Sequence, residues 1–177
     1  MSQTKKVTLR VGSDFLGYMR KSVGEKSAEE VVMAVRRPCG GFLVAGKSFY
    51  PPGTLRLLTG RMKPGESPWD ALARELYEET GFTSDGAELI GTVEHTLSDS
   101  ESELVFCSCV FVIPERAGQP HPMDDDEQLT EFQDASVDDL RRIVQRLRIL
   151  PGKWADWGRF RAEVIQALVE MIAANSL

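Results

Sequence analysis

The stretch from Gly60 to Phe82, GRMKPGESPWDALARELYEETGF, combines a loop, a helix start, four glutamates and a glycine stop within 23 residues. Ser67 is a suitable N-cap because its hydroxyl can accept a hydrogen bond from a free backbone N–H group. Pro68 suits the first helical position, where no N–H group is needed. Gly81 can adopt the left-handed conformation that commonly ends a helix. We therefore predict a helix over residues 68–80.

The predicted helix has two different faces. Glu75, Glu78 and Glu79 are spaced i, i+3 and i+4, so their carboxylates share one face and repel one another by about 0.2–0.5 kcal/mol per pair. The apolar stripe that we expect to be buried lies on another arc and consists of Trp69, Leu72, Ala73, Leu76 and Thr80. The acidic face is either solvated, as on an ordinary amphipathic helix, or a site for a hard divalent cation, which prefers oxygen ligands.

The spacing of nine residues favours the cation site. Their order is Gly60, five residues, Glu66, seven residues, Arg74-Glu75-Leu76, one residue, Glu78-Glu79, one residue and Gly81-Phe82. This pattern resembles the Nudix box, with every fixed position filled. Thr59 stands where the family often has a further glycine, a departure that we expect to affect loop shape more than chemistry. The resemblance covers roughly Val31 to Phe160 and implies an α/β fold, the Nudix-type α/β/α sandwich with a mixed central sheet.

The resemblance also implies a metal site on the acidic face. It assigns Glu75, Glu78 and Glu79 to Mg²⁺ or Mn²⁺ binding, with the main-chain carbonyl of Gly60 as a further ligand. Glu79 is our first choice for a metal ligand and Glu75 the next. One glutamate near the metal can instead act as general base; the family varies on which, and Glu75 and Glu78 are the candidates. The metal would neutralise phosphate charge and activate water.

Three residues around the box receive supporting roles from the same resemblance. Arg74 is expected to hold a glutamate in its productive rotamer, and Glu66 is expected to be structural and to pair with Arg74. A late acidic loop in the family often supplies a further catalytic acid. The segment Asp124-Asp125-Asp126-Glu127 lies where that loop is expected, and Glu127 is our choice. The alternative is that this segment is only a solvated acidic loop.

The implied reaction is the metal-dependent hydrolysis of a phosphoanhydride bond in a nucleoside diphosphate linked to another moiety. We expect a nucleotide sugar or a nucleoside di- or triphosphate. Arg56, Phe49 and Tyr50, in and after a proline-rich loop, are candidates for substrate binding, although packing is the better explanation for each of the two aromatic residues. A nucleotide-sensing binding module without catalysis is the main alternative. Such modules generally lack one or more acids of the box, whereas this chain retains all of them.

Composition limits the remaining possibilities. The chain has 177 residues, a net charge of −6 and a pI near 5.1, which argues against a surface that follows a nucleic-acid polymer. The polar N-terminus does not resemble a signal peptide, and no apolar run reaches membrane-spanning length. Three cysteines form no even disulfide framework. We expect a cytoplasmic protein that binds a small-molecule diphosphate, and a homodimer is plausible.

The rest of the chain is expected to supply the sheet and its covering helices. Residues 1–30 form an N-terminal extension with a short strand and a turn, which covers a sheet edge or contacts a second subunit, and residues 31–177 form the Nudix domain. We predict strands at 31–37, 42–46, 55–59, 89–97, 104–113 and 129–135, and further helices at 137–147 and 159–174. The first two strands are expected to form a hairpin. His95 is expected to be a hydrogen-bonded structural residue.

Overall fold

The computed structural model describes residues 3–25, 28–123 and 128–175. Its strands are β1 (Gln3–Arg10), β2 (Glu29–Val35), β3 (Phe42–Lys47), β4 (Arg56–Arg61), β5 (Glu88–Ser98), β6 (Glu103–Ile113) and β7 (Leu129–Ala135). Its helices are α1 (Ser13–Glu25), α2 (Pro68–Thr80), α3 (Val137–Arg148), the short 3₁₀ helix η2 (Gly152–Trp154) and α4 (Ala155–Asn175). All of the strands and helices predicted after residue 30 are present, with ends shifted by a few residues at most.

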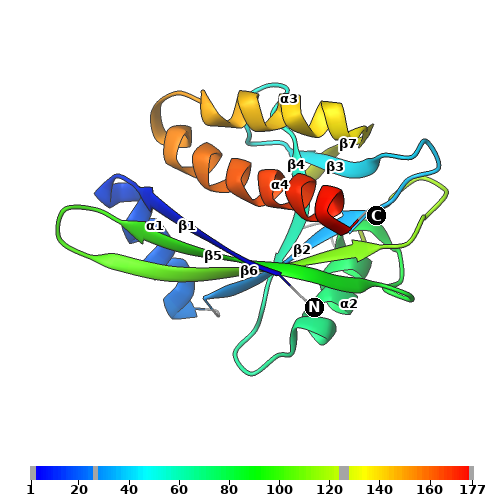
Figure 1. Cartoon of the computed structure of the whole chain (residues 1–177), viewed down its shortest axis with the longest axis horizontal. Helices are drawn as coiled ribbons and strands as arrows, with labels where there is room; N and C mark the ends of the chain where they lie inside the picture. The colour runs from blue at the N-terminus through cyan, green and yellow to red at the C-terminus, as the bar shows by residue number, and fades with distance from the viewer. Residues whose placement is uncertain (1–2, 26–27, 124–127, 176–177) are drawn as a thin grey trace.

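The strands form one mixed sheet between two layers of helices. Their order is β1-β5-β6-β2-β4-β3-β7, in which β1 with β5 and β2 with β6 are parallel pairs and the other pairs are antiparallel. Helices α3 and α4 lie side by side over one face, and α2 lies on the other (Figure 1). The predicted α/β/α sandwich is confirmed.

The two faces of the sheet have separate apolar cores because side chains alternate along each strand. In β2, Val32 and Ala34 join the core under α3 and α4, whereas Val31, Met33 and Val35 join the core under α2. A strand buried on both faces reads as a continuous apolar run. This explains why the β2 segment shows no alternation in the sequence.

The predicted hairpin between β2 and β3 is wrong. Strand β4 lies between the two strands and pairs with both of them. Only one bridge, between Arg36 and Phe42, joins the ends that the turn connects. A turn sequence indicates that the chain reverses direction, but it does not exclude a third strand from entering between the two arms. The location of β4 is important because its last residues begin the Nudix box.

The N-terminal segment belongs to the same sheet. Strand β1 pairs with β5 over its whole length, from Gln3 to Arg10, and so covers the edge that β5 would otherwise expose. Helix α1 contributes Phe15, Leu16 and Met19 to a small core that includes Phe160 of α4. Of the two roles expected for this segment, covering a sheet edge is the one that the structure displays.

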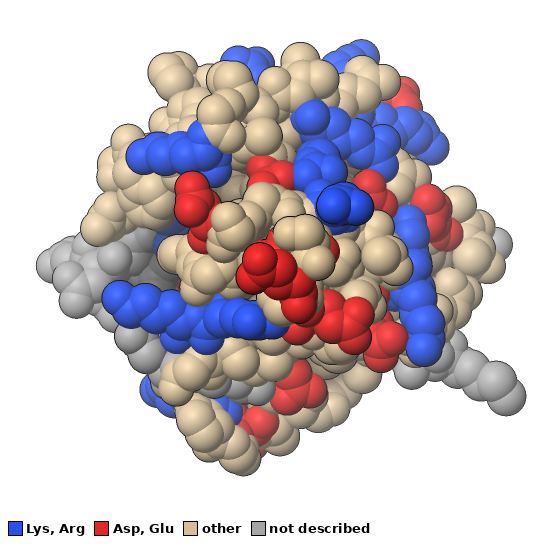
Figure 2. All heavy atoms as spheres, turned by 90° about the vertical axis from the view of Figure 1, so that its left-hand side faces the viewer, with Lys and Arg blue, Asp and Glu red and all other residues tan. Residues whose placement is uncertain are grey.

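The face of the molecule seen in Figure 2 carries charges of both signs. On the face seen in Figure 2, Lys and Arg side chains are interspersed with Asp and Glu rather than gathered into one basic strip. None of the helices in the described part of the chain combines the length and the apolar character needed to span a bilayer.

Candidate metal and substrate site

Helix α2 begins and ends at the predicted residues. The Ser67 hydroxyl accepts a hydrogen bond from the backbone N–H of Asp70 at 3.2 Å and donates to the Asp70 carboxylate at 2.6 Å. Gly81 has φ of 73°, in the left-handed region, and its N–H donates to the Tyr77 carbonyl at 2.8 Å. Pro68 occupies the start of the helix. A distant segment completes the C-terminal end, since the backbone N–H groups of His121 and Met123 donate to the carbonyls of Thr80 and Glu78, at 3.0 and 2.8 Å.

The buried face of α2 differs from the predicted apolar stripe. Trp69, expected to be buried, is 50% exposed, and Ala73 is also exposed. In their place the sheet covers Glu75, which is 7% exposed, and Glu79, which is 0% exposed. The solvated interpretation of the acidic face is therefore excluded for these two glutamates. Burying a carboxylate is costly unless positive charge or hydrogen-bond donors accompany it.

Gly60 allows Glu75 to lie against the sheet. The residue is in β4, and a Cβ atom placed there would overlap the Cγ and carboxylate atoms of the Glu75 side chain. Any other residue at this position would force the glutamate away. The first glycine of the box is therefore required by close packing, and the Gly60 backbone is adjacent to the Glu75 carboxylate.

Arg74 joins three glutamates of the box. Its Nε and Nη2 atoms donate to the two carboxylate oxygens of Glu66, each at 2.8 Å. Its Nη1 atom donates to Glu75 at 2.6 Å and to Glu78 at 3.1 Å. A further bond from Nη2 reaches the Arg61 carbonyl at 3.1 Å. The expected pairing of Arg74 with Glu66 is confirmed. It is a bidentate ion pair, the geometry that the planar guanidinium favours with a carboxylate.

These contacts shift the ionisation of the pair. Hydrogen bonds from Arg74, above all, lower the pKa of Glu66 to about 2. The same hydrogen bonds raise the pKa of Arg74 above its already high value, with Glu75 adding to the effect. Both partners therefore stay charged at any physiological pH, and the arginine provides a permanent positive charge beside the acidic face of α2.

Arg56 provides a second positive charge, which interacts electrostatically with Glu79 of this face. Its side chain is buried at the start of β4, where it donates to the Tyr50 hydroxyl at 2.7 Å and to Thr59 Oγ1 at 3.0 Å. Burial alone would lower the pKa of Arg56, but interactions with Tyr50 and with the Glu79 carboxylate raise it above its usual value. The Glu79 carboxylate thus helps to keep the buried Arg56 charged. A substrate-binding candidate and a metal-binding candidate are brought together here.

The acidic face of α2 offers the oxygen donors that a divalent cation prefers. Glu75, Glu78 and Glu79 are oxygen donors on two successive turns of one helix, beside the Gly60 backbone, which suits Mg²⁺ or Mn²⁺. Among the described residues, no three His, Cys, Asp or Glu side chains converge on a metal position. The carboxylates of Glu75 and Glu78 are both paired with Arg74 instead. The donor types and their placement fit, and Glu78 is the most exposed of the three.

The other predicted aromatic residues lie in a cluster of rings. Phe49 and Tyr50, in the loop after β3, contact Trp154 of η2, with ring centroids 6.3 Å and 5.7 Å away. Tyr50 also contacts Trp157 at 4.8 Å. Sequence reasoning did not assign Trp154 to the site. The only available signal was a pair of tryptophans just after Pro151, about 100 residues from the loop that they meet.

Glu127 and the three aspartates before it lie outside the described residues. His95 is buried on β5 as expected, but the expectation of hydrogen bonding is wrong, since neither ring nitrogen has a partner in the structure. Its ring packs instead against Phe160, with centroids 4.6 Å apart.

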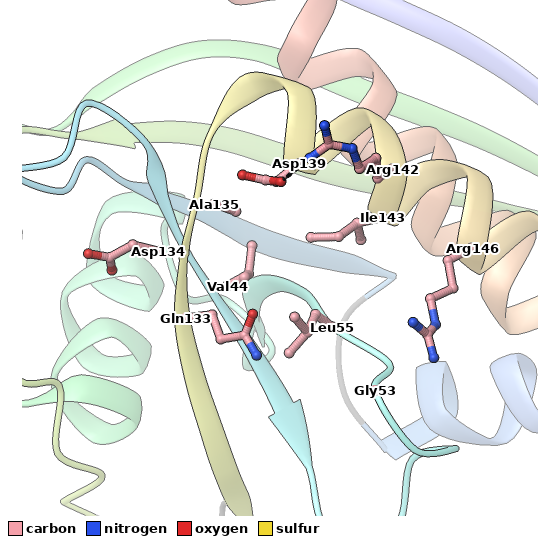
Figure 3. A pocket seen from close by; sticks show the side chains of 10 residues that line it. All are labelled: Val44, Gly53, Leu55, Gln133, Asp134, Ala135, Asp139, Arg142, Ile143 and Arg146. Atoms are coloured by element: carbon pink, nitrogen blue, oxygen red, sulfur yellow. Dashed lines mark hydrogen bonds and ion pairs between the residues drawn. The ribbon is translucent and has the colours of Figure 1, made fainter.

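A cavity of about 310 Å³ lies elsewhere, between α3, β3, β7 and the loop before β4 (Figure 3). Its lining consists of Val44, Gly53, Leu55, Gln133, Asp134, Ala135, Asp139, Arg142, Ile143 and Arg146. Asp134 is already paired with Arg37 at 2.8 Å and Asp139 with Arg142 at 2.6 Å. No described residue assigned to the site lines this cavity, which lies on the α3 side of the sheet. We therefore do not place the reaction in it.

A mixed sheet between helices, with a capped acidic helix seated on a strand glycine, defines a Nudix-type architecture. A family model described as the NUDIX domain matches residues 26–157, about three quarters of the chain. The chain therefore belongs to the Nudix family. No curated protein sequence matches it.

Solved structures show the same fold. The NUDIX domain of Shewanella oneidensis NrtR, complexed with ADP ribose, has a TM-score of 0.57 and 13% identity, covering 94% of this chain and 99% of its own. A C. elegans Ap4A hydrolase has a TM-score of 0.53 and 16% identity, with coverage of 82% and 98%. A MutT protein from Methanosarcina mazei Go1 has a TM-score of 0.51 and 21% identity, with coverage of 79% and 93%. At these identities the likeness concerns the fold.

Proposed function

We propose that this protein hydrolyses a phosphoanhydride bond in a nucleoside diphosphate linked to another moiety, with Mg²⁺ or Mn²⁺ as cofactor. A nucleotide sugar or a nucleoside di- or triphosphate is the proposed substrate. The observation that carries the proposal is the burial of Glu75 and Glu79 on α2, with Glu75 seated on Gly60. Membership of the Nudix family supports it, as do structural neighbours named as an Ap4A hydrolase and as an ADP-ribose complex.

In this proposal Glu75, Glu78 and Glu79 hold the metal together with the Gly60 carbonyl. When bound, a divalent cation supplies charge neutralisation at the phosphates and activation of water. Glu78 is the residue best able to exchange Arg74 for another cation, because it is the most exposed and its bond to Arg74 is the longest, at 3.1 Å. Arg74 then remains bound to Glu66 and positions Glu75. Glu75 or Glu78 is the candidate general base.

Glu127, which lies outside the described residues and precedes β7 in the sequence, is proposed as a further catalytic acid. Glu127→Gln should lower kcat by orders of magnitude, measured with whichever diphosphate compound the wild-type protein cleaves. A rate near that of the wild type would remove it from the mechanism.

Arg56, Phe49 and Tyr50 are proposed to bind the substrate outside the reacting bond. Arg56 is suited to this role because its charge is permanent and close to Glu79. The Tyr50 hydroxyl is occupied by Arg56 at 2.7 Å, so Tyr50 acts through its ring and by fixing Arg56.

The test is a panel of diphosphate compounds incubated with Mg²⁺ or Mn²⁺, with the products identified by mass. Wild type is compared with Glu79→Gln and with a matched control, Glu101→Gln, which makes the same chemical change at an exposed position between β5 and β6. We expect cleavage by wild type and by the control and none by Glu79→Gln. If no compound is cleaved although one nucleotide raises the melting temperature, the protein is a binding module and the proposal fails.

A cytoplasmic location and a homodimer remain predictions. Strand β1 forms one edge of the sheet, so a second copy has an edge available for pairing. Sedimentation equilibrium would decide the oligomeric state, since a single species of 19.7 kDa would contradict the dimer.

A further inference from the structure

Arg37 follows β2 and is buried, with 6% of its surface exposed. The Cζ atom of its guanidinium lies 5.9 Å from the centroid of the Phe82 ring, at the end of the Nudix box. Its Nε atom donates to the Asp134 carboxylate of β7 at 2.8 Å. Burying a guanidinium is costly unless its charge and its N–H donors have partners. Asp134 balances the charge, and the remaining donors contact a third segment.

That third segment is the loop after β6, residues 114–123. The Nη2 atom of Arg37 donates to the Gly118 carbonyl at 2.7 Å, and its Nη1 atom donates to the Arg116 carbonyl. A guanidinium presents its donors in a rigid plane, so acceptors from separate segments fix their relative positions when they share one arginine. Arg37 therefore joins the end of β2, strand β7 and the 114–123 loop at one point.

The 114–123 loop continues across the last turn of α2. The backbone N–H of Met123 donates to the Glu78 carbonyl at 2.8 Å. The backbone N–H of His121 donates to the Thr80 carbonyl at 3.0 Å. Carbonyls in the last turn of a helix have no partner within the helix, so the loop supplies what this turn lacks. It contacts the backbone of Glu78, whose side chain is a proposed metal ligand.

Arg116 attaches the same loop to the segment that leaves α2. Its Nη2 atom donates to the carbonyls of Thr83 and Asp85, at 3.1 and 2.6 Å. Its backbone N–H donates to the Arg36 carbonyl at 3.0 Å. The loop is thus bonded to the chain on both sides of Gly81, which ends the helix.

We propose that Arg37 is a positioning residue for the metal site of the box. By fixing the 114–123 loop, it holds the last turn of α2 in place and with it the backbone that carries Glu78 and Glu79. The inference rests on the proposed function, because it concerns the metal ligands of that site. Stability alone does not require an ion pair here, since apolar side chains of similar volume often stabilise a buried position as well. The guanidinium adds directed hydrogen bonds to three segments.

Amide hydrogen exchange tests whether Arg37 holds the loop, without any substrate. In Arg37→Met and Arg37→Lys, the amides of His121 and Met123 should exchange about 10- to 100-fold faster than in wild type, the range for a lost hydrogen bond to a charged group. Slowly exchanging amides in the centre of β6 should be unchanged. Arg37→Lys retains the charge opposite Asp134 but lacks the planar set of donors, so it remains informative if Arg37→Met does not fold.

Arg36→Met is the matched control. It makes the same chemical change at the neighbouring residue, whose guanidinium lies over the Phe42 ring, 5.6 Å from its centroid. The bonds between Arg36 and its neighbours at Ile113 and Arg116 use the Arg36 backbone, so the substitution leaves them in place. Exchange at the loop amides should equal that of wild type.

Mn²⁺ binding and kinetics test the effect on the site. In the Arg37 variants Mn²⁺ affinity, measured from the electron paramagnetic resonance signal of the free ion, should fall about 10-fold, as when other supports of metal ligands are removed. With a compound that wild type cleaves, kcat should fall about 10- to 100-fold while KM stays within about 2-fold, because misplaced groups at the reacting bond lower the rate. A variant that is merely less stable would keep wild-type values at temperatures where it is fully folded.

The inference is overturned if the loop amides of the Arg37 variants exchange as in wild type, or if exchange rises equally in the centre of β6. It is also overturned if the folded variants retain wild-type Mn²⁺ affinity or kcat. Failure of the proposed function looks different, because wild type itself would then cleave no compound, and exchange together with Mn²⁺ affinity would still decide the role of Arg37. If wild type and the Arg37 variants cleave the same compound equally fast, the hydrolase proposal stands and this inference fails.

Discussion

His95 should make the stability of this protein depend on pH below neutrality. The side chain is 0% exposed on β5, and burial is the main reason that its pKa falls from the ordinary 6.5 to about 4. The Glu30 carboxylate opposes the shift, whereas Arg161 and Lys5 add to it. The folded protein therefore keeps a neutral imidazole at a pH where the unfolded chain is protonated.

The sign and size of the change in the free energy of unfolding follow from this difference in the pKa of His95 between the folded and unfolded states. Because the unfolded state binds a proton near pH 6.5 and the folded state only near pH 4, the free energy of unfolding falls as the pH drops from about 6.5 to about 4. A shift of about 2.5 units at about 1.4 kcal/mol per unit gives a loss of about 3 kcal/mol from this residue. Above pH 6.5 and below pH 4 its contribution should be constant.

The measurement is urea unfolding at several pH values between 7.5 and 4 for wild type and for His95→Gln, which cannot be protonated. The variant should lose about 3 kcal/mol less than wild type over this range, whatever its stability at neutral pH. His121→Gln, at the other and exposed histidine, is the control and should follow wild type. Parallel curves for wild type and His95→Gln would refute the reasoning, because they would mean that the buried imidazole is protonated in the folded state or not buried.

Three further predictions concern two contacts of the box and the start of α3, and each is measured by urea unfolding at neutral pH. Gly60→Ala should cost about 1–3 kcal/mol because its Cβ overlaps Glu75; an unchanged midpoint would contradict the close contact. The double substitution Arg74→Lys, Glu66→Gln should lower the free energy of unfolding by roughly 1 kcal/mol less than the sum of the two single substitutions, because either single change already breaks the bidentate ion pair. Strict additivity would mean that the pair is not formed. Ser136→Ala should cost about 1 kcal/mol, since the N-cap hydroxyl of α3 and its two hydrogen bonds with Asp139 are lost while the bond from the residue 136 backbone N–H to the Asp139 carboxylate remains; a cost near zero would show that the hydroxyl contributes nothing.

The N-terminal segment shows where sequence reasoning was weakest. Only a short strand and a turn were expected within residues 1–30, whereas β1 runs from Gln3 to Arg10 and helix α1 from Ser13 to Glu25. The pairing partner of β1 is β5, about 90 residues away. The pairing energy of a polar, half-exposed strand comes from that partner, so the strand is only weakly visible in its own sequence.

The ends of α2 and of α3 follow from residues that are close together in the chain. Ser67, Gly81 and Ser136 satisfy backbone groups within one turn, so their hydrogen bonds can be inferred from spacing alone. The same holds for the nine positions of the box, which place three glutamates on one helix face. The fold class and the family could therefore be predicted before the structure was known.

The orientation of that helix depended on contacts across the sheet. Glu75 is buried because Gly60 leaves room for its side chain, whereas Trp69 is half exposed although its side chain is large and apolar. The entry of β4 between β2 and β3, and the meeting of Phe49 with Trp154, likewise join segments that are distant in sequence. The free energies of these contacts come from side-chain packing and electrostatic interactions, which depend on which surfaces are adjacent in the folded protein. Only the tertiary structure shows which surfaces these are.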